Sequence, residues 1–449
     1  MLGSTIQERR ETAPILLKKF VLLKMNHLNR KEIAESVFFN SVQENRFKTI
    51  RISAVIFMPL RRETAAANAL VQRLLVRSTQ EYPDFTVLSK KLCSLYGASL
   101  SGNVKKTGDI QVITLSIAGI ADRYTFDQEN LSEQLAQLLC SVIFAPRLLG
   151  EAFFEEDIMQ EKRQLLDLID SEFNDKRIYA SLRATEIMCK NEIFGLNRYG
   201  MPKDINSASS HQIYEAWKNI IETGVFNFMY VGGTNLEKIS AVFQNCFKDR
   251  NRNPITLSTE IIKKANHITR ETEEMEVSQS KLMMGFRTEL AEPEDDVTAM
   301  RLMSVVLGGG AQSKLFKNVR EKLSLCYYCF AKYDRAKGIM FIDSGIESAN
   351  VDQTQNAVLK ELGDMQKGII SDSEIEASKL LINNTFFSSN DTVYGLENWY
   401  TSQLLDKKID STEEACQKIN NITKEQIISA ANKVTLDTVY VLQPLTERE

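Results

Sequence analysis

The first informative pattern is a run of apolar residues at three- and four-residue spacing within the first hundred residues. The residues that share this spacing are Ala67, Leu70, Val71, Leu74 and Leu75. The spacing predicts an amphipathic helix over residues 64–77, because positions three and four apart lie on one helix face. The polar stretch 78–83 predicts its end and a turn, and a second helix is predicted over residues 88–95. Residues 109–117 then alternate apolar and polar side chains, which is typical of a strand.

The same order of strand, helix and strand returns in the second half of the chain. The matching segments are 51–57 with 281–286, 108–117 with 338–342, 212–213 with 426–427, and 228–231 with 438–441. This imperfect duplication predicts an α+β protein with two homologous domains, over residues 1–248 and 249–449. The polar stretch 249–280 predicts the linker and the entry to the second domain. Ahead of residue 40, only Val21–Met25 indicates a strand.

Composition limits the classes of protein that the chain can belong to. It has 449 residues of which 43% are hydrophobic, enough to build full cores in two domains. A net charge of −4 gives no reason to expect nucleic acid or a membrane surface as a partner. The N-terminus lacks the apolar stretch of a secretion signal, no run is long enough to span a membrane, and seven cysteines at irregular spacing suit a reducing compartment. We therefore expect a cytoplasmic protein.

Several segments carry a resemblance to a known family. The stretches "STQEYPD", "LSKKLCSLYGASL" and "GDIQVITLSI", which follow the first predicted helix in this order, resemble the first half of the zinc peptidases of the pitrilysin/insulinase family. "NRYGMP" at 197–202 is similar to the segment that precedes the last helix of that half. The resemblance covers nearly the whole chain from about residue 40. It implies that each domain is a mostly antiparallel sheet packed with helices, and that the chain forms half of a clamshell.

The resemblance also shows what the first predicted helix lacks. In active members it carries His-x-x-Glu-His, which here places Ala69 and Arg73 at the two histidines and Gln72 at the catalytic glutamate. Two imidazoles at i and i+4 can share a zinc ion while the carboxylate accepts a proton from its water. Alanine offers no lone pair, a guanidinium has only donors, and an amide does not act as a base near neutral pH. The chain is therefore expected to bind no zinc.

The third ligand of the family is a glutamate in a later charged helix, which here corresponds to residues 151–163. Matching Glu161 to the later acidic residue of that helix puts Phe154 at the ligand position, and a shift of one residue puts Glu155 there. A single carboxylate does not hold zinc.

No other group of metal ligands is evident in the sequence. The three histidines, His27, His211 and His267, lie far from one another and from the cysteines. Cys326 and Cys329 form a lone Cys-x-x-Cys without a second pair at zinc-finger spacing, so they are interpreted as ordinary, partly buried cysteines.

The second half contains several candidate functional residues. Gly308-Gly309-Gly310 precedes a predicted helix that has Arg320 near its end, and a strand follows in which Leu325, Tyr327 and Cys329 alternate with Cys326, Tyr328 and Phe330. On the residues alone, Arg320 is a surface arginine and Tyr327 a packed tyrosine. The triple glycine is a flexible turn, since no Gly-Lys-Ser/Thr follows it as in a phosphate-binding loop.

The family resemblance favours a different interpretation of these residues. "GGGAQSKLFKNVREKLSLCYY" is similar to a family segment whose arginine holds a substrate carbonyl and whose tyrosine stabilises the oxyanion. Arg320 and Tyr327 match those positions, and Tyr328 is a weaker candidate for the tyrosine. The glycines would then be a gate or a contact for an extended peptide.

These observations predict the metal-free member of a bacterial two-gene peptidase pair. The chain would pair with a homologous, zinc-bearing subunit and contribute Arg320 and Tyr327 to a shared chamber that cleaves peptides. The competing hypothesis is a scaffold or peptide-binding protein that keeps the fold without the chemistry. A neighbouring gene that encodes His-x-x-Glu-His would favour the pair.

Overall fold

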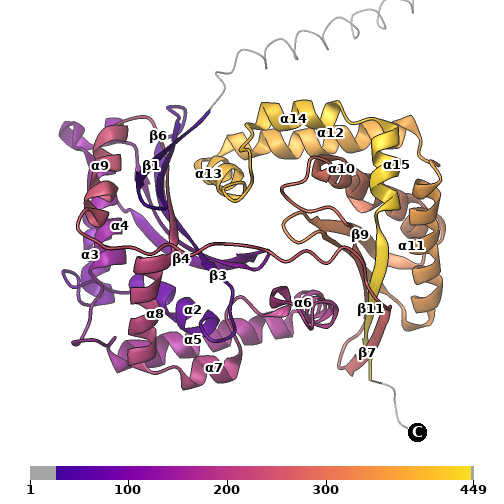
Figure 1. The fold of residues 1–449 in the computed structure, drawn as a ribbon, viewed down its shortest axis with the longest axis horizontal. Helices are drawn as coiled ribbons and strands as arrows, with labels where there is room; N and C mark the ends of the chain where they lie inside the picture. The colour runs from indigo at the N-terminus through magenta and orange to yellow at the C-terminus, as the bar shows by residue number, and fades with distance from the viewer. Residues whose placement is uncertain (1–26, 446–449) are drawn as a thin grey trace, which may run out of the picture.

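The computed structural model describes residues 27–445, which form two mixed sheets, each covered by helices (Figure 1). This arrangement confirms the predicted α+β fold of two similar, mostly antiparallel sheets. The predicted strand Val21–Met25 lies outside the described residues. Within residues 27–445, no helix is both long enough and apolar enough to cross a membrane.

The first sheet has six strands in the order β1-β2-β6-β3-β5-β4. Among the strands of this sheet within residues 27–445, only β2 and β6 pair in parallel. β4 forms a free edge of the sheet. The strands are β1 Leu28–Ala34, β2 Val37–Gln43, β3 Thr49–Pro59, β4 Ser99–Thr107, β5 Ile110–Ile120 and β6 Val225–Gly232.

The second sheet has five strands in the order β7-β11-β8-β10-β9, with β9 at a free edge. In the described part of the chain, the one parallel pair of this sheet is β7–β11, the counterpart of β2–β6. The duplication seen in the sequence is therefore present in the topology. The strands are β7 Thr269–Met275, β8 Ser280–Arg287, β9 Cys326–Asp334, β10 Ile339–Ile346 and β11 Thr435–Pro444.

Most helices pack on the outer face of the sheet in their own half and enclose a separate core there (Figure 1). The helices of the first half are α2 Ala65–Leu75, α3 Phe85–Ser94, α4 Leu131–Phe144, α5 Glu155–Asn174, α6 Lys176–Met188, α7 Pro202–Ser207, α8 Ser210–Thr223 and α9 Leu236–Phe247. Those of the second half are α10 Val297–Gly308, the π-helix η4 Leu315–Lys322, α11 Val351–Gln366, α12 Asp372–Ser388, α13 Val393–Thr401, α14 Thr412–Asn420 and α15 Lys424–Asn432.

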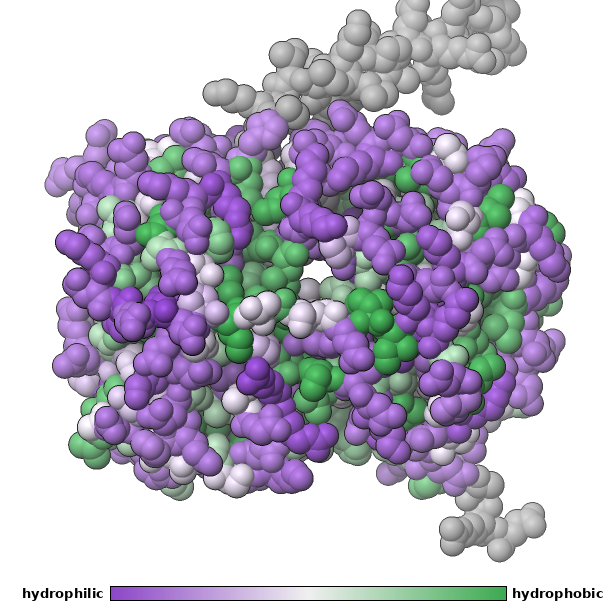
Figure 2. Space-filling model, in the orientation of Figure 1, coloured by the Kyte–Doolittle hydropathy of each residue, from purple (hydrophilic) through white to green (hydrophobic). Residues whose placement is uncertain are grey.

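The two halves exchange one helix each across the middle of the molecule (Figure 1). Helix α6 of the first half packs on the inner face of the second sheet, where Ala184 contacts the cluster of Met283 and Tyr440. Helix α13 of the second half packs on the inner face of the first sheet, where Leu396 belongs to the same cluster as Met229. Each half therefore lacks part of one core without the other, and we infer that the two halves form one structural unit. Figure 2 shows an opening between them on one face, with hydrophobic residues gathered around it.

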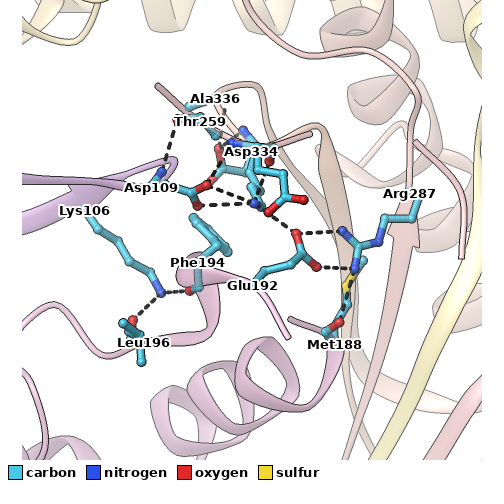
Figure 3. A network of polar contacts seen from close by, with 12 residues as sticks. Lys106, Asp109, Met188, Glu192, Phe194, Leu196, Thr259, Arg287, Asp334 and Ala336 are labelled. Atoms are coloured by element: carbon cyan, nitrogen blue, oxygen red, sulfur yellow. Dashed lines mark hydrogen bonds and ion pairs between the residues drawn. The ribbon is translucent and has the colours of Figure 1, made fainter. Parts of the chain in front are cut away.

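A buried network of charges joins the halves where the two sheets approach each other (Figure 3). The ammonium of Lys337, which is fully buried, lies 3.2 Å from Asp109 and 2.9 Å from Glu192. Glu192 also accepts a hydrogen bond from Arg287 at 2.7 Å, and Arg287 pairs with Asp437 at 2.8 Å. Hydrogen bonds from these cations keep the pKa of Glu192 below its ordinary value, although burial acts in the opposite direction.

The segment between the halves, residues 248–268, crosses the middle of the molecule as an extended chain (Figure 1). It is fixed to the first half: Asn253 N donates to Glu222 O at 3.0 Å, and the buried guanidinium of Arg252 donates to the carbonyl of Ile221 at 3.1 Å. The hydroxyl of Thr259 accepts from Asp109 N at 3.1 Å. The polar stretch that the sequence indicates as a linker is thus a bound strap.

Candidate functional site

Helix α2 carries the three degenerate positions, and its surroundings fix it firmly. Its first turn is held by Gln111 of β5, whose amide donates to Ala65 O at 3.0 Å and accepts from Asn68 at 2.9 Å. Gly200 approaches it closely, since a Cβ there would lie 2.8 Å from Ala66 N, and its φ of +74° also favours glycine. The helix predicted over residues 64–77 is thereby confirmed, with bounds Ala65–Leu75.

The residues at the expected metal-ligand positions differ in their surroundings. Ala69 is 1% exposed and lies inside the first hydrophobic core. Gln72 is 5% exposed, and its side chain lies across the backbone of Gly102 on β4, where a Cβ would come within 1.7 Å of Nε2. Core packing therefore fills the first ligand position, and the amide at the base position rests on the edge strand.

Arg73 and Arg77 join α2 to α5 through ion pairs. Arg73 Nε lies 2.9 Å from Glu161 Oε2, and Arg77 Nη1 lies 3.3 Å from Glu161 Oε1. Arg77 also pairs with Asp157 at 2.7 Å, and Arg147 approaches the same carboxylate at 3.2 Å. A positively charged side chain thus occupies the second histidine position and neutralises the carboxylate that faces it.

The carboxylate opposite Arg73 is Glu161, which differs from the expectation for the third ligand. Phe154 is the N-cap residue of α5. The guanidinium carbon of Arg147 lies over its ring, 3.8 Å from the centroid of the Phe154 ring. Glu155 begins the helix and is exposed. The alignment that places Phe154 or Glu155 at the third-ligand position is therefore at least about one helical turn too early in the chain. The face of α5 that meets α2 carries Asp157, Glu161 and Gln164 at helical spacing.

No cluster in residues 27–445 brings together three or more His, Cys, Asp or Glu side chains able to hold a metal ion. His27 and His267 are exposed, and the His211 ring nitrogen lies 3.4 Å from Glu151 O. All seven cysteines are free. Cys326 and Cys329 are both buried in the second core, where Ser344 Oγ donates to Cys329 Sγ at 3.0 Å.

A pocket of about 610 Å³ opens beside α2 at the free edge of β4. Gln72, Arg73 and Arg77 line it from α2, Gln160 and Gln164 from α5. Its remaining walls include Gly102 of β4 and Phe85, which is 64% exposed. The pocket has amides and paired charges where the family's zinc chemistry would be.

In the second half, Arg320 lies on the π-helix η4, whose wider turn is closed by bonds such as Leu323 N to Asn318 O at 3.1 Å. Leu315 and Val319 anchor this segment in the core. The guanidinium of Arg320 lies 4.6 Å from the Phe316 ring centroid, and its nearest carboxylate is the exposed Glu321 at 3.7 Å. Arg320 is therefore placed at the surface with most of its donors free of carboxylates.

Tyr327 is the extra residue of a β-bulge in the edge strand β9. Tyr328 pairs with Gly345 of β10, whereas Cys326 pairs with the next residue, Ile346. The bulge breaks the alternation expected from the sequence, since Cys326 and Cys329 enter the same core, and leaves Tyr327 57% exposed. The phenol donates a hydrogen bond to Glu347, and this bond raises the pKa of Tyr327.

Arg320 and Tyr327 line one pocket of about 340 Å³, together with Glu347 and Asn350. Tyr328 does not share it: its ring lies on the other face of β9, 4.8 Å from the guanidinium of Arg177 on α6. The predicted pairing of Arg320 with Tyr327 thus has a geometric basis, and Tyr328 lies elsewhere.

Close packing requires glycine at residues 308–310, because a Cβ at each of the three positions would meet a neighbouring atom. Gly308 is buried, and a Cβ there would lie 2.5 Å from Ala331 N of β9. A Cβ on Gly309 would meet Val305 at 2.6 Å, and one on Gly310 would meet Leu381 at 2.7 Å. Gly308 is inaccessible to a peptide, so the substrate contact expected there is not available.

Two features of the site were missed in the sequence. The first is Arg77, one turn after Arg73, whose partners Asp157 and Glu161 stand at i and i+4 on α5; this matching spacing is a usable signal. The second is Glu347, which follows β10 and is distant from Tyr327 in the chain, so local patterns carry no sign of it.

Comparisons with known proteins agree with this geometry. A family model described as the peptidase M16 inactive domain matches residues 207–381, which include Arg320 and Tyr327. A protein of Bacillus subtilis (strain 168) described as the probable inactive metalloprotease YmfF is 31% identical over 402 residues, which are 90% of this chain and 94% of that protein. The crystal structure of a conserved protein from Enterococcus faecalis V583 has a TM-score of 0.86 at 25% identity, covering 94% of this chain and 100% of that one. A peptidase M16 inactive domain from Pseudomonas fluorescens has a TM-score of 0.76 at 15% identity, covering 94% and 99% of the two chains.

Proposed function

The chain belongs to the pitrilysin/insulinase (M16) family of peptidases, and from its site geometry we propose that it is the metal-free subunit of a paired zinc peptidase. It contributes Arg320 and Tyr327 to a peptide-cleaving chamber, and a homologous partner holds the zinc. The single observation that carries this proposal is that Arg320 and Tyr327 line one open pocket while α2 lacks every zinc ligand.

Several features of α2 support the proposal that the partner holds the zinc and that α2 does not form an unusual metal site of its own. Ala69 is packed in the core, and Arg73 brings a permanent positive charge to the place of a metal ligand. The two positive charges of a zinc ion at about 5 Å from that guanidinium would be repelled by roughly 7 kcal/mol at an effective dielectric constant of 20. In the proposed pair, the zinc is therefore held by the other chain.

The placement of Arg320 and Tyr327 supports a role toward a substrate outside this chain. No hydrogen bond or ion pair within residues 27–445 connects either side chain to α2. A guanidinium with free donors can hold a peptide carbonyl, and a phenol can donate to the oxyanion that forms during cleavage. Both roles require the peptide and zinc to be presented from the partner's side. Seven free cysteines further support a cytoplasmic location for such a complex.

A scaffold or peptide-binding protein of the same fold is the second candidate function. The hydrogen bond from Tyr327 to Glu347 favours it, because the single proton of the phenol is already donated. For the tyrosine to stabilise an oxyanion, the phenol has to turn away from Glu347 when the peptide binds.

The experiment that tests the proposal uses the chain alone and in complex with a co-expressed homologue that carries His-x-x-Glu-His. Bound zinc and cleavage of an unfolded fluorogenic peptide are measured for both samples. We expect no zinc and no cleavage for the chain alone, and cleavage by the complex. Arg320→Ala and Tyr327→Phe should each lower kcat of the complex about 100-fold, as the loss of an oxyanion or positioning donor does.

Matched controls separate a role in cleavage from an effect on folding. Arg163→Ala on the exposed face of α5 and Tyr124→Phe, which is 48% exposed, should leave the rate unchanged. Cleavage that ignores both Arg320→Ala and Tyr327→Phe would leave the scaffold as the better account, and zinc bound by the chain alone would refute the metal-free assignment.

A further inference from the structure

A second pocket, of about 190 Å³, lies on the opposite face of β4 from the pocket beside α2. It is enclosed between the inner face of the first sheet and α13, the helix supplied by the second half. Its walls are mostly polar on both sides, with Val55 as the apolar exception. The polar residues are Arg51, Ser101, Asn103, Lys105, Thr114 and Ser116 from the strands, and Tyr394, Glu397, Asn398 and Thr401 from α13.

The polarity of this pocket is unusual because the rest of the same helix contact is apolar. One side of α13 packs Val393, Leu396 and Tyr400 against Met229 and Val231. A helix that only covered the sheet would continue this apolar contact toward β4. The change from apolar to polar lining along one helix therefore indicates a built site at the sheet edge.

The charges within the pocket leave one cation in excess. Glu397 is 4% exposed, and its carboxylate accepts hydrogen bonds from Arg51 and from the buried hydroxyl of Ser53. Arg51 and Glu397 thus neutralise each other. The ammonium of Lys105 is partly buried and interacts with the charge of Glu397, but it forms no direct hydrogen bond or ion pair with any residue from 27 to 445. The carboxylate whose charge acts on Lys105 is Glu397, which is already bonded to Arg51, so the two cations face one anion and the pocket keeps one excess positive charge. An incoming anion would balance that charge.

The backbone beside the pocket is available to an extended chain. No strand among the described residues pairs with the outer edge of β4. Side chains of a strand alternate between faces, so those of Ser101, Asn103 and Lys105 share the α13 face. Gly102 lines both pockets, where the absence of a side chain leaves the backbone accessible. A peptide strand added to β4 would alternate its side chains between the two pockets.

We propose that the pocket between β4 and α13 is an acidic-side-chain subsite: Lys105, supported by Arg51, receives the carboxylate of a glutamate or aspartate in an extended peptide that pairs with β4. The subsite rests on the proposed function in that both take a peptide as the ligand. The subsite lies in a chain that has no zinc ligands on α2, so it selects and orients a peptide without cleaving it. The occupant is a peptide because the pocket opens beside an unpaired strand edge, and it is acidic because the uncompensated charge is positive.

The experiment measures the binding of labelled peptides to the full chain without any partner subunit. The probes are fluorescein-labelled nonapeptides of alternating threonine and valine that carry glutamate, glutamine or lysine at the central position. Fluorescence anisotropy should give a Kd for the glutamate peptide about fivefold or more below that for the glutamine peptide, and weaker binding still for the lysine peptide. Hydrogen exchange of residues 99–107 should slow when the glutamate peptide is bound.

Variants at Lys105 identify the group that reads the charge. Lys105→Met should remove the difference between the glutamate and glutamine peptides, Lys105→Arg should keep it, and Lys105→Glu should reverse the preference toward lysine. Lys90→Met removes the same charge from the exposed face of α3 and should change nothing. Thermal melting of each variant verifies that it is folded, so that a loss of preference reports binding alone.

Three results would overturn the subsite. They are equal affinity for the glutamate and glutamine peptides, a preference that survives in Lys105→Met, and free glutarate that binds as tightly as the glutamate peptide, which would indicate a site for small anions rather than for a peptide. Because these measurements need neither zinc nor a partner, their failure is distinguishable from failure of the cleavage assay with Arg320 and Tyr327 variants.

Discussion

Arg73 of α2 and Glu161 of α5 form an ion pair with 2.9 Å between Nε and Oε2. The glutamate is nearly buried, with 7% of its side chain exposed. In the active members that the chain resembles, a zinc ion bridges the corresponding helices. Here the guanidinium makes the bridge directly, so a link between the two helices is present although Arg73 stands where those members have a histidine.

The two arginines that share Glu161 should contribute to stability in a non-additive way. Arg73→Ala or Arg77→Ala alone leaves Glu161 with one cation, and we expect each to cost about 1 kcal/mol in the free energy of unfolding. Removing both leaves a buried carboxylate unpaired, which should cost about 3–5 kcal/mol. Urea unfolding of the single and double variants measures the coupling, with Arg163→Ala as the exposed control. A double variant whose loss equals the sum of the two single losses would show that Glu161 does not depend on the pair.

The pKa of Tyr327 should depend on Glu347. The hydrogen bond and the negative charge of Glu347 raise that pKa, because an ionised phenol would lose its donated proton and be repelled. Glu347→Gln should therefore lower it toward the ordinary value for tyrosine. An NMR titration of tyrosine ring carbons, with Tyr327→Phe to assign the signal, measures the change. An unchanged titration would mean that the hydrogen bond is not maintained in solution.

Lys106 should make stability increase with pH at alkaline values. Its Nζ donates to the carbonyls of Phe194 and Leu196 (Figure 3), and burial lowers its pKa from 10.5 to about 8. Between these two values the unfolded chain retains a proton that the folded protein has lost. The contribution of Lys106 to the free energy of unfolding should thus rise by about 2–3 kcal/mol from pH 8 to 10.5.

The measurement for Lys106 is a difference between two proteins at each pH. Urea unfolding of the wild type and of Lys106→Met at pH 7.5, 9 and 10.5 cancels the titration of the other groups. As pH rises, the free energy of unfolding of the wild type should increase relative to that of Lys106→Met. A difference that stays constant would contradict a depressed pKa for this lysine.

Lys337 should hold the two halves together. Lys337→Met leaves Asp109 and Glu192 without their shared buried cation, and we expect a loss of about 3–5 kcal/mol in the free energy of unfolding. Calorimetry should still show one transition for the wild type, because α6 and α13 complete the inner faces of each other's sheets. Lys332→Met, at an exposed position on β9, is the control and should change stability little. Two separate transitions in the wild type would contradict the coupling of the halves.

The sequence predicted much of the fold because its signals are local. The helix at Ala65–Leu75 follows from apolar spacing, and the strands at Thr49–Pro59 and Ser280–Arg287 follow from runs that recur in both halves. The edge strand β4, Ser99–Thr107, was missed, since its first five residues are mostly exposed and Leu100 and Val104 are its only large apolar side chains. The bulge at Tyr327 was missed for another reason: pairing with β10 decides it, and the strand pattern alone does not.

By itself, the sequence determined the absence of zinc chemistry at residues 69, 72 and 73, because coordination and proton transfer depend on which atoms a side chain carries. It also determined that arginine and tyrosine are present at 320 and 327. Only the tertiary structure decided that Glu161 faces Arg73, that Glu347 receives the phenol of Tyr327, and that α13 encloses Lys105 against β4. Each of these contacts joins separate elements of the fold. Their geometry is set when the sheets and helices pack together, so the short-range periodicity of the sequence does not predict it.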